Sequence, residues 1–212
     1  MKLLLTVCLT WALLYTAESL RCQTCTNNMC TTSTSVQCPA TSTACRTITS
    51  VMGTDSSTDV TVNKTCSTLL SCITPVNFAT EWSVNRGFRR EAHNQLCCVT
   101  DNCNLQTLAT PSTFTNGKVC PACRSSAASM AGICNTTLAC VGAEDSCFSG
   151  NTTLRCTDEL QLGCLTRNLC NNLPVLNTLF GDNTKITCGA PWSVRMSTVL
   201  LSFALTAFKV LV

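Results

Sequence analysis

Two short stretches, LRCQTC (residues 20–25) and LCCVTDNCN (residues 96–104), bracket the first half of this chain. Between them the cysteines recur at intervals too short for a large apolar core. Leaving out Cys8 near the N-terminus, ten cysteines fall between residues 22 and 103, and nine more between residues 120 and 188. This density predicts small domains held together by disulfides.

The composition supports the same interpretation. Of 212 residues, 20 are Cys, 12% are charged, 5% are aromatic and one is His. With so few bulky side chains, disulfides must supply stability that a larger domain obtains from buried apolar area. An ordinary cytosolic enzyme does not fit this composition.

The N-terminus has the pattern of a secretory signal peptide. Lys2 precedes an apolar run over residues 3–14, and Ala17 and Ser19 occupy the −3 and −1 positions of a cleavage site. We expect residues 1–19 to be removed and Leu20 to begin the mature protein. Export places the remaining cysteines in an oxidising compartment.

The C-terminus, residues 189–212, resembles a glycosylphosphatidylinositol (GPI) attachment signal. Small residues and a polar spacer precede residues 198–212, which are apolar apart from Ser202, Thr206 and Lys209. Gly189 and Ser193 are the candidate attachment residues. The expected location is the extracellular face of the plasma membrane, held through the lipid; a short tail anchor and a secreted form are the alternatives.

The two halves of the chain repeat. Each begins with C-x-x-C, continues with a C-x6-C pair (Cys38/Cys45 and Cys140/Cys147) and later contains C-x5-C. We therefore predict two tandem domains, residues 20–104 and 120–188. The segment 105–119 lacks Cys and has the composition of an exposed linker.

The residues between the cysteines are typical of β-strands. Thr, Val and Ile alternate over residues 46–51 and 58–62, and residues 52–57 supply a turn, which predicts a hairpin closed by Cys45 and Cys66. Residues 81–95 are compatible with a helical turn or an irregular loop. Ten cysteines allow roughly 945 pairings, so spacing alone leaves the connectivity open.

The opening L-x-C-x-x-C and the closing C-C-x-x-D-x-C-N resemble the LU domain of the Ly-6/urokinase receptor (uPAR) family, an all-β, three-finger fold shared with snake neurotoxins. The resemblance implies that fingers two and three span residues 46–65 and 73–96. It also implies five disulfides in the first domain: Cys22–Cys45, Cys25–Cys30, Cys38–Cys66, Cys72–Cys97 and Cys98–Cys103.

The second domain matches the same template in part. The resemblance implies the pairs Cys120–Cys147, Cys123–Cys134, Cys140–Cys164 and Cys170–Cys188. The chain then departs from the template, because Cys188 is followed by Gly189 and the last disulfide loop is missing. Cys156 has no template partner, which predicts an intermolecular bond such as a disulfide dimer, a shuffled pairing or a free thiol.

The sequence offers little for catalysis. His93 is the only histidine and is expected at the surface, without an acid–base partner, so we predict no enzymatic activity, no catalytic residue, no cofactor and no metal site. The C-x-x-C pairs are interpreted as structural disulfides rather than as zinc ligands or a redox dithiol. Three of the 14 basic residues and one of the 11 acidic residues lie in the terminal signals, so the mature chain is nearly neutral and no nucleic-acid partner is expected.

Three N-x-S/T sequons predict N-glycans at Asn63, Asn135 and Asn151. Glycans mark faces that stay exposed and leave other faces free to bind. Because Asn63 lies in finger two of the first domain, that side is a poor docking face.

Recognition of an extracellular or cell-surface protein is the function that remains. Disulfides fix the fingers before binding, which lowers the entropy cost of association. The candidate contacts lie on finger three, where Trp and Arg are residue types common at hot spots: Phe78, Trp82, Arg86, Phe88, Arg89 and Arg90. The alternative without a binding role is that residues 86–90 form a solvated loop and that Phe78 and Trp82 pack beneath their own finger.

The sequence therefore predicts a GPI-anchored glycoprotein with a non-enzymatic receptor, adhesion or modulatory role of the urokinase-receptor type. One alternative is a secreted protein resembling the two-domain γ-type phospholipase A2 inhibitors, which share this repeat order. Another is a toxin-like modulator of a receptor or ion channel.

Overall fold

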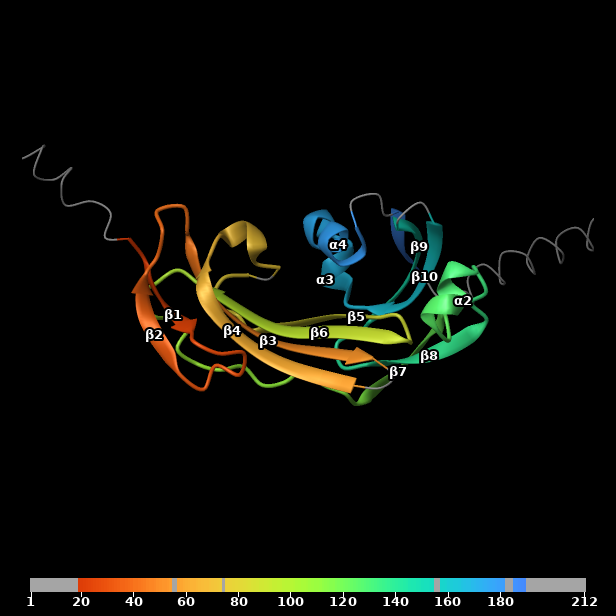
Figure 1. Ribbon diagram of the computed structural model, residues 1–212, viewed down its shortest axis with the longest axis horizontal. Helices are drawn as coiled ribbons and strands as arrows, with labels where there is room; N and C mark the ends of the chain where they lie inside the picture. The colour runs from red at the N-terminus through yellow and green to blue at the C-terminus, as the bar shows by residue number, and fades with distance from the viewer. Residues whose placement is uncertain (1–18, 55–56, 74, 155–156, 182–184, 190–212) are drawn as a thin grey trace, which may run out of the picture.

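The computed structural model describes residues 19–54, 57–73, 75–154, 157–181 and 185–189. Strands form most of it, with short helices placed between them (Figure 1). In chain order the elements are β1 (Arg21–Cys25), β2 (Ser33–Gln37), β3 (Ala44–Thr54), β4 (Ser57–Ser67), η1 (Leu69–Ser71), β5 (Thr80–Asn85), β6 (Arg89–Cys98), β7 (Thr115–Ala122), α2 (Ser126–Met130), β8 (Thr136–Val141), β9 (Ser146–Leu154), β10 (Thr157–Leu165), α3 (Arg167–Cys170), α4 (Leu173–Phe180) and β11 (Lys185–Gly189).

The first domain has three antiparallel fingers, formed by β1 with β2, β3 with β4, and β5 with β6. Finger two is the predicted hairpin. At its base Cys45 lies opposite Cys66 in the strand register, and each forms its disulfide with another cysteine. Residues 81–95, which the sequence left open between a helical turn and a loop, lie almost entirely in the β5–β6 hairpin. Pairing of β6 with β3 explains this, because the neighbouring strand supplies hydrogen-bond partners that the local sequence cannot reveal.

Nine disulfides hold the described residues together, and they join the same cysteines that the family resemblance implies. In each domain the bridges crowd into a buried hub. Cys22, Cys38, Cys45 and Cys98 form the hub of the first domain, and Cys120, Cys140, Cys147 and Cys164 that of the second. The fold is therefore all-β and disulfide-rich, with two tandem domains of the three-finger type, the second of which is modified after its second finger.

The second domain keeps two fingers of the template and replaces the third. Finger one pairs β7 with β8 and has α2 near its tip, and finger two pairs β9 with β10. Helices α3 and α4 follow, and β11 returns to pair with β9. The Cys170–Cys188 bridge ties α3 to β11. Among the described residues, no helix is long and apolar enough to cross a membrane.

A single sheet of seven strands runs through both domains, in the order β11-β9-β10-β5-β6-β3-β4. The join is between β10 of the second domain and β5 of the first, where Cys164 pairs with Asn85 and Leu165 with Val84. Gly163 permits this close approach, because a Cβ there would lie 1.9 Å from the carbonyl oxygen of Asn85.

The main apolar core lies on the concave face of this sheet, beneath α3 and α4 (Figure 1). Helix α4 presents Leu176 and Phe180 to the sheet, one turn apart on one face. Phe180 meets Phe148 edge to face, with ring centroids 5.3 Å apart. Buried side chains from both domains share this core: Trp82, Val84, Phe148, Leu165, Leu169, Leu176 and Phe180.

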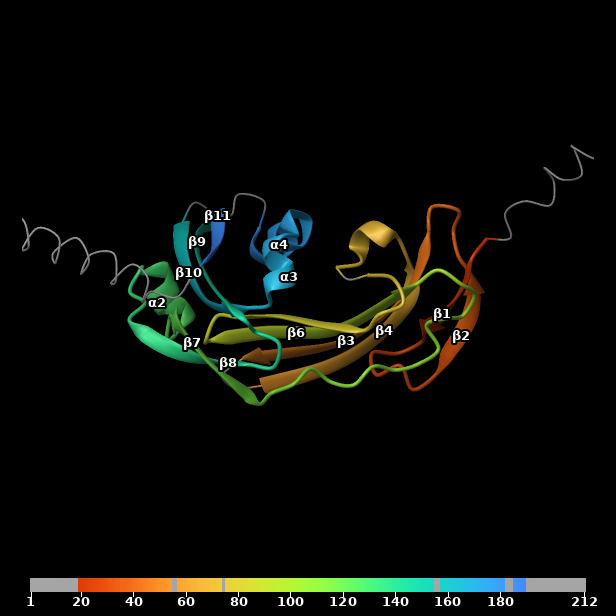
Figure 2. The same cartoon turned by 180° about the vertical axis from the view of Figure 1, so that it is seen from behind.

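The segment between β6 and β7 runs along the opposite face of the sheet (Figure 2). Its carbonyl groups accept hydrogen bonds from sheet side chains: Thr49 Oγ1 donates to Leu108 at 2.8 Å, and Asn94 Nδ2 donates to Ala109 at 2.8 Å. Pro111 is buried, although most neighbouring side chains are exposed. The segment that the sequence presents as a linker is therefore attached along the first domain.

Candidate functional site

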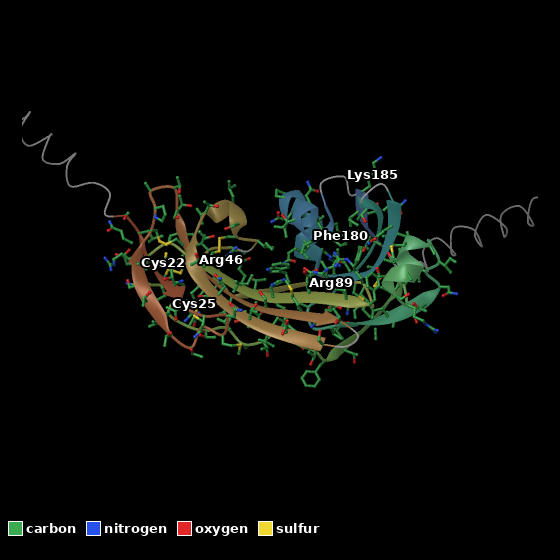
Figure 3. The ribbon with its side chains drawn as sticks, in the orientation of Figure 1. Cys22, Cys25, Arg46, Arg89, Phe180 and Lys185 are labelled. Carbon is green, nitrogen blue, oxygen red and sulfur yellow. A yellow bond between two sulfur atoms is a disulfide. The ribbon has the colours of Figure 1, made fainter. Side chains whose placement is uncertain are left out.

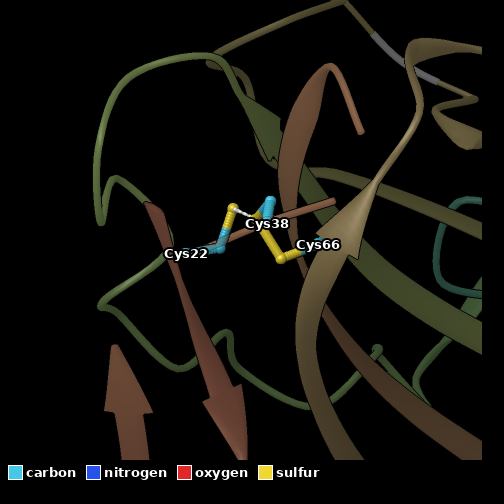
Figure 4. A group of neighbouring side chains, drawn as sticks. All are labelled: Cys22, Cys38 and Cys66. Atoms are coloured by element: carbon cyan, nitrogen blue, oxygen red, sulfur yellow. Dashed lines mark hydrogen bonds between the residues drawn. A yellow bond between two sulfur atoms is a disulfide. The ribbon is translucent and has the colours of Figure 1, made fainter. Parts of the chain in front are cut away.

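The sulfur hubs are structural. Sγ of Cys38 lies 3.1 Å from Sγ of Cys22, so two disulfides pack against each other in the first domain (Figure 4). Cys66 lies beside them, and an equivalent group of three sulfurs occurs at Cys120, Cys140 and Cys164. Every one of these sulfurs belongs to a disulfide. Because the thiolate is the form that ligates metals, these oxidised groups are not metal sites.

His93 is not a surface residue, contrary to the sequence-based expectation. Its side chain is 6% exposed and stacks on Trp82, with ring centroids 3.9 Å apart. Nδ1 shares a 2.8 Å hydrogen bond with Ser50 Oγ. Burial, together with the positive charge of Arg46, lowers the pKa of His93 to about 4. The imidazole is therefore neutral at physiological pH and belongs to the core of finger three.

The basic loop 86–90 is the joint between the domains rather than a solvated loop. Arg86 is 6% exposed, donates to the carbonyl oxygen of Leu179 at 2.8 Å and lies over the ring of Phe180 at 4.4 Å. It also pairs with Glu91 at 3.3 Å. Burial lowers the pKa of Arg86, while Glu91 opposes the change. The expectation that Arg86 is exposed for a partner is wrong, because the second domain covers it.

Arg90 also joins the two domains, on the other face of the sheet. Its Nε lies 2.8 Å from Oε1 of Glu144, a fully buried carboxylate of the second domain. Ser83 Oγ and Asn85 Nδ2 donate to the same carboxylate at 3.3 and 3.4 Å. Nothing in the sequence marked Glu144, since a single Glu in a polar stretch normally lies at the surface. The structure thus places Arg90, like Trp82, largely in the interior.

Phe88 and Arg89 remain at least partly accessible, as does Phe78 at the start of finger three. The side chain of Arg89 is 51% exposed and pairs with Glu91 at 2.9 Å, and Phe88 is half-buried. Figure 3 shows Arg89 and Phe180 on the side of the sheet that carries α3 and α4. These residues line the cavity described next.

A cavity of about 180 Å³ lies at the domain joint. The first domain contributes Arg86, Phe88 and Arg89. The second domain contributes Ser126, the first residue of α2, and Thr152 of β9. It also contributes two side chains of β10 and two at the end of α4: Glu159, Gln161, Leu179 and Phe180. The cavity exists only because the β5–β10 pairing brings the two domains together.

Two buried polar atoms on its lining residues lack a hydrogen-bond partner among the described residues. They are Oγ1 of Thr152 and Oε1 of Gln161, whose side chains are 1% and 5% exposed. The amide nitrogen of Gln161 is used, since it donates to Oε2 of Glu159 at 3.1 Å. Sequence reasoning missed both residues, because Thr and Gln in a strand carry no motif.

Apart from the cavity, the segment 69–78 at the start of finger three carries exposed apolar side chains. Leu70 is 91% exposed, Phe78 67% and Leu69 44%. The backbone beneath them is fixed by buried Gln95, which donates to the carbonyl oxygen of Ser71 at 2.9 Å and accepts from the amide of Ile73 at 3.2 Å. Of these apolar residues, the sequence analysis named only Phe78.

The remaining predicted sites divide between described and undescribed residues. Asn63, Asn135 and Asn151 are all exposed. Asn135 and Asn63 each line a further surface hollow, of about 550 and 350 Å³. Gly189 is exposed at the end of β11. Cys156, Ser193 and the segment 1–18 lie outside the described residues, as do residues 190–212.

No protein-family model matches this chain, and no curated protein sequence matches it either. Among solved structures, the crystal structure of mouse TEX101 is similar, with 15% sequence identity over 74% of this chain and 86% of that chain. The TM-score is 0.26. This value is too low to transfer any property, so the fold assignment rests on the strand order and disulfides of this chain.

Proposed function

We propose that this protein is a non-enzymatic cell-surface glycoprotein that binds an extracellular or cell-surface protein. In this proposal residues 1–19 are a removed signal peptide, and a GPI lipid replaces the segment after Gly189 or Ser193. N-glycans occupy Asn63, Asn135 and Asn151. The exposed positions of all three asparagines support the glycosylation.

The observation that carries the protein-binding role is the exposed apolar segment 69–78. Exposed Leu and Phe side chains on a monomer are common singly, but three within ten residues on a fixed backbone favour an interaction surface. The Cys72–Cys97 disulfide and the hydrogen bonds to Gln95 hold the segment before any partner arrives. Binding there therefore costs little ordering entropy.

The buried position of His93 supports a role without catalysis. An acid–base group must reach a substrate, whereas His93 is stacked on Trp82 and has its pKa lowered to about 4. Loss of a hydrolase activity on substitution of His93, with the fold intact, would contradict this part of the proposal.

Anchorage is tested by staining transfected cells before and after treatment with phosphatidylinositol-specific phospholipase C. Release of the surface signal is the expected result. Protein found only in the medium would instead favour the secreted inhibitor-like alternative, and a resistant surface signal would indicate a peptide tail anchor.

Protein binding is tested by placing a photo-crosslinking phenylalanine analogue at Leu70 of the full chain on cells. Crosslinks to a defined protein are expected at this position and not at exposed Thr58 of β4, the matched control. Leu70→Ser with Phe78→Ser should abolish binding of that protein while leaving surface expression unchanged. Equal crosslinking at Thr58 and Leu70 would reject the segment as the interface. A change in channel currents without a crosslinked partner at Leu70 would favour the toxin-like alternative.

A further inference from the structure

We propose that a hollow beside Gly189 binds one phosphodiester group, the ethanolamine phosphate of the chain's own lipid anchor. This inference rests on the proposed anchorage and deepens it, because it assigns residues of the second domain to the anchor. The hollow has a volume of about 390 Å³. Its lining includes Lys118 of β7, Arg167 of α3 and Gly189, one of the two candidate attachment residues, at the end of β11.

The first support is a pair of cations with unused hydrogen-bonding capacity. The side chain of Arg167 is 72% exposed, and among the described residues only its Nε has polar neighbours, Oδ2 of Asp145 at 3.6 Å and Oγ of Ser146 at 3.5 Å. Lys118 is half-buried, and its ammonium group forms no ion pair within the described part of the chain. A guanidinium fork and an ammonium group are both well suited to phosphate oxygens.

The second support is the charge of the lining itself. Among the described residues that line the hollow, Asp145 supplies the one carboxylate, against the two cations Lys118 and Arg167. The excess of one positive charge matches the single negative charge of a phosphodiester. The Asp145 side chain is 51% exposed, and its contact with Arg167 is longer than a hydrogen bond. Solvent screens this ion pair, so the guanidinium group remains available to a phosphate.

The third support is the fixed position of Gly189. It directly follows Cys188, and the Cys170–Cys188 disulfide ties the end of β11 to α3. Gly189 also lies opposite Cys147 in the pairing of β9 with β11, and the Cys120–Cys147 disulfide ties β9 to β7. The helix and the strand that carry the two cations are therefore held beside Gly189 before a lipid is attached.

The fourth support is the reach of the anchor. In a GPI-anchored protein an amide bond joins the carboxyl group of the last residue to ethanolamine phosphate. The phosphorus then lies within roughly 7 Å of the carbonyl carbon of Gly189, since five bonds of about 1.5 Å separate them. Exposed cations hold a free phosphate only weakly at physiological salt. A short tether, however, raises the effective concentration of the phosphate to about the millimolar range, so a weak site becomes occupied.

The variants change the charge of the lining and keep the disulfides. Arg167→Gln removes the guanidinium group, and Asp145→Asn removes the opposing carboxylate. Arg124→Gln, at an exposed position after β7, is the matched control. The readout is the rate at which an amine reagent acylates Lys118, measured by mass spectrometry relative to Lys185, which projects outward at the start of β11 (Figure 3). A phosphate paired with the Lys118 ammonium group shields it from the reagent.

Two forms of the full chain are compared. The form released from cells by phosphatidylinositol-specific phospholipase C retains ethanolamine phosphate. Leu200→Asp with Leu201→Asp interrupts the apolar tail and gives a lipid-free form, which is captured by antibody. We expect acylation of Lys118, relative to Lys185, to be at least threefold slower in the released form.

Within the released form, Arg167→Gln should restore fast acylation of Lys118, Asp145→Asn should slow it further, and Arg124→Gln should leave it unchanged. The lipid-free form is also probed with N-acetylglycerophosphoethanolamine, a soluble phosphodiester. This compound should slow acylation of Lys118, whereas N-acetylethanolamine, which lacks the phosphate, should not.

Equal acylation of Lys118 in both forms, or an effect of Arg124→Gln as large as that of Arg167→Gln, would overturn the proposal. Protection by the soluble phosphodiester without a difference between the forms would also overturn it, because the phosphodiester would then come from another source, such as a lipid headgroup. Absence of release by the phospholipase would refute the anchor itself, and the soluble compound would still decide whether the hollow binds phosphate. None of these results bears on crosslinking at Leu70.

Discussion

Arg90 of the first domain and Glu144 of the second form an ion pair of 2.8 Å in which the carboxylate is fully buried. Glu144 also accepts hydrogen bonds from Ser83 and Asn85 of the first domain and from the amide of Val141 in its own. The two domains are therefore joined by a polar cluster on one face of the sheet and by the shared apolar core on the other.

We predict that Glu144→Gln destabilises the protein by about 3–5 kcal/mol, because Arg90 keeps its charge and loses its buried partner. The measurement is urea unfolding followed by the fluorescence of buried Trp82. Asp145→Asn is the control. Its ion pair with Arg167 is 3.6 Å long and exposed, so a change of less than about 1 kcal/mol is expected there. Equal effects of the two substitutions would contradict the importance of the buried pair.

Gly163→Ala should disrupt the continuous sheet. A Cβ at this position would lie 1.9 Å from the carbonyl oxygen of Asn85, so β10 and β5 must separate. We expect faster amide hydrogen exchange in both strands and a loss of stability of about 1–3 kcal/mol. Gly53→Ala in β3, where the nearest atom would be 3.9 Å away, should change neither quantity strongly. Unaltered exchange at the joint in Gly163→Ala would show that the two strands do not depend on this contact.

Stability should fall on acidification between pH 6.5 and 4. The pKa of His93 is lowered to about 4 in the folded protein, against 6.5 for the free side chain, so in this window the unfolded chain binds the additional proton. The stability that depends on neutral His93 is fully present above pH 6.5 and amounts to roughly 3 kcal/mol. In His93→Gln this part of the pH dependence should disappear, as measured by urea unfolding at pH 7, 5.5 and 4. A slope that is the same in the variant would assign the acid sensitivity to other groups.

Asn104→Ala should unfold or strongly weaken the first domain. The Asn104 side chain is fully buried, accepts from the amide of Gln23 at 2.9 Å and donates to the carbonyl oxygens of Gln23 and Arg46 at 2.9 and 3.2 Å. Its loss removes three hydrogen bonds to buried backbone groups, and we expect a cost of about 3 kcal/mol or more. Asn28→Ala at an exposed position is the control. A stability near that of the control would show that water replaces the side chain.

The extent of sequence-based prediction differs between elements for physical reasons. Finger two was predictable because its alternating Thr, Val and Ile residues form a local hairpin between Cys45 and Cys66. Finger three was implied by the family resemblance but not by its local sequence, since β6 becomes a strand by pairing with β3, 35 or more residues away along the chain. Helix α4 replaces a finger of the template and was also not predicted.

The candidate site shows the same division. The basic loop 86–90 could be recognised in the sequence, but its position between the two domains could not. A cluster of arginines is normally expected at the surface, whereas the second domain buries Arg86. Thr152, Gln161 and Glu144 carry no motif. Thr152 and Gln161 stand out only because each has a buried polar atom without a hydrogen-bond partner among the described residues. Glu144 stands out only because its buried carboxylate pairs with Arg90.

The sequence by itself determined the all-β, disulfide-rich class, the two-domain repeat and the sequons, because cysteine spacing and turn composition are local properties of the chain. The tertiary structure alone decided that one sheet runs through both domains, that the linker lies against it and that a cavity forms at the joint. These features depend on contacts such as Leu165 with Val84 and Arg90 with Glu144, between residues 54 or more positions apart. Such pairings depend on which surfaces fit together, and no local pattern encodes that fit.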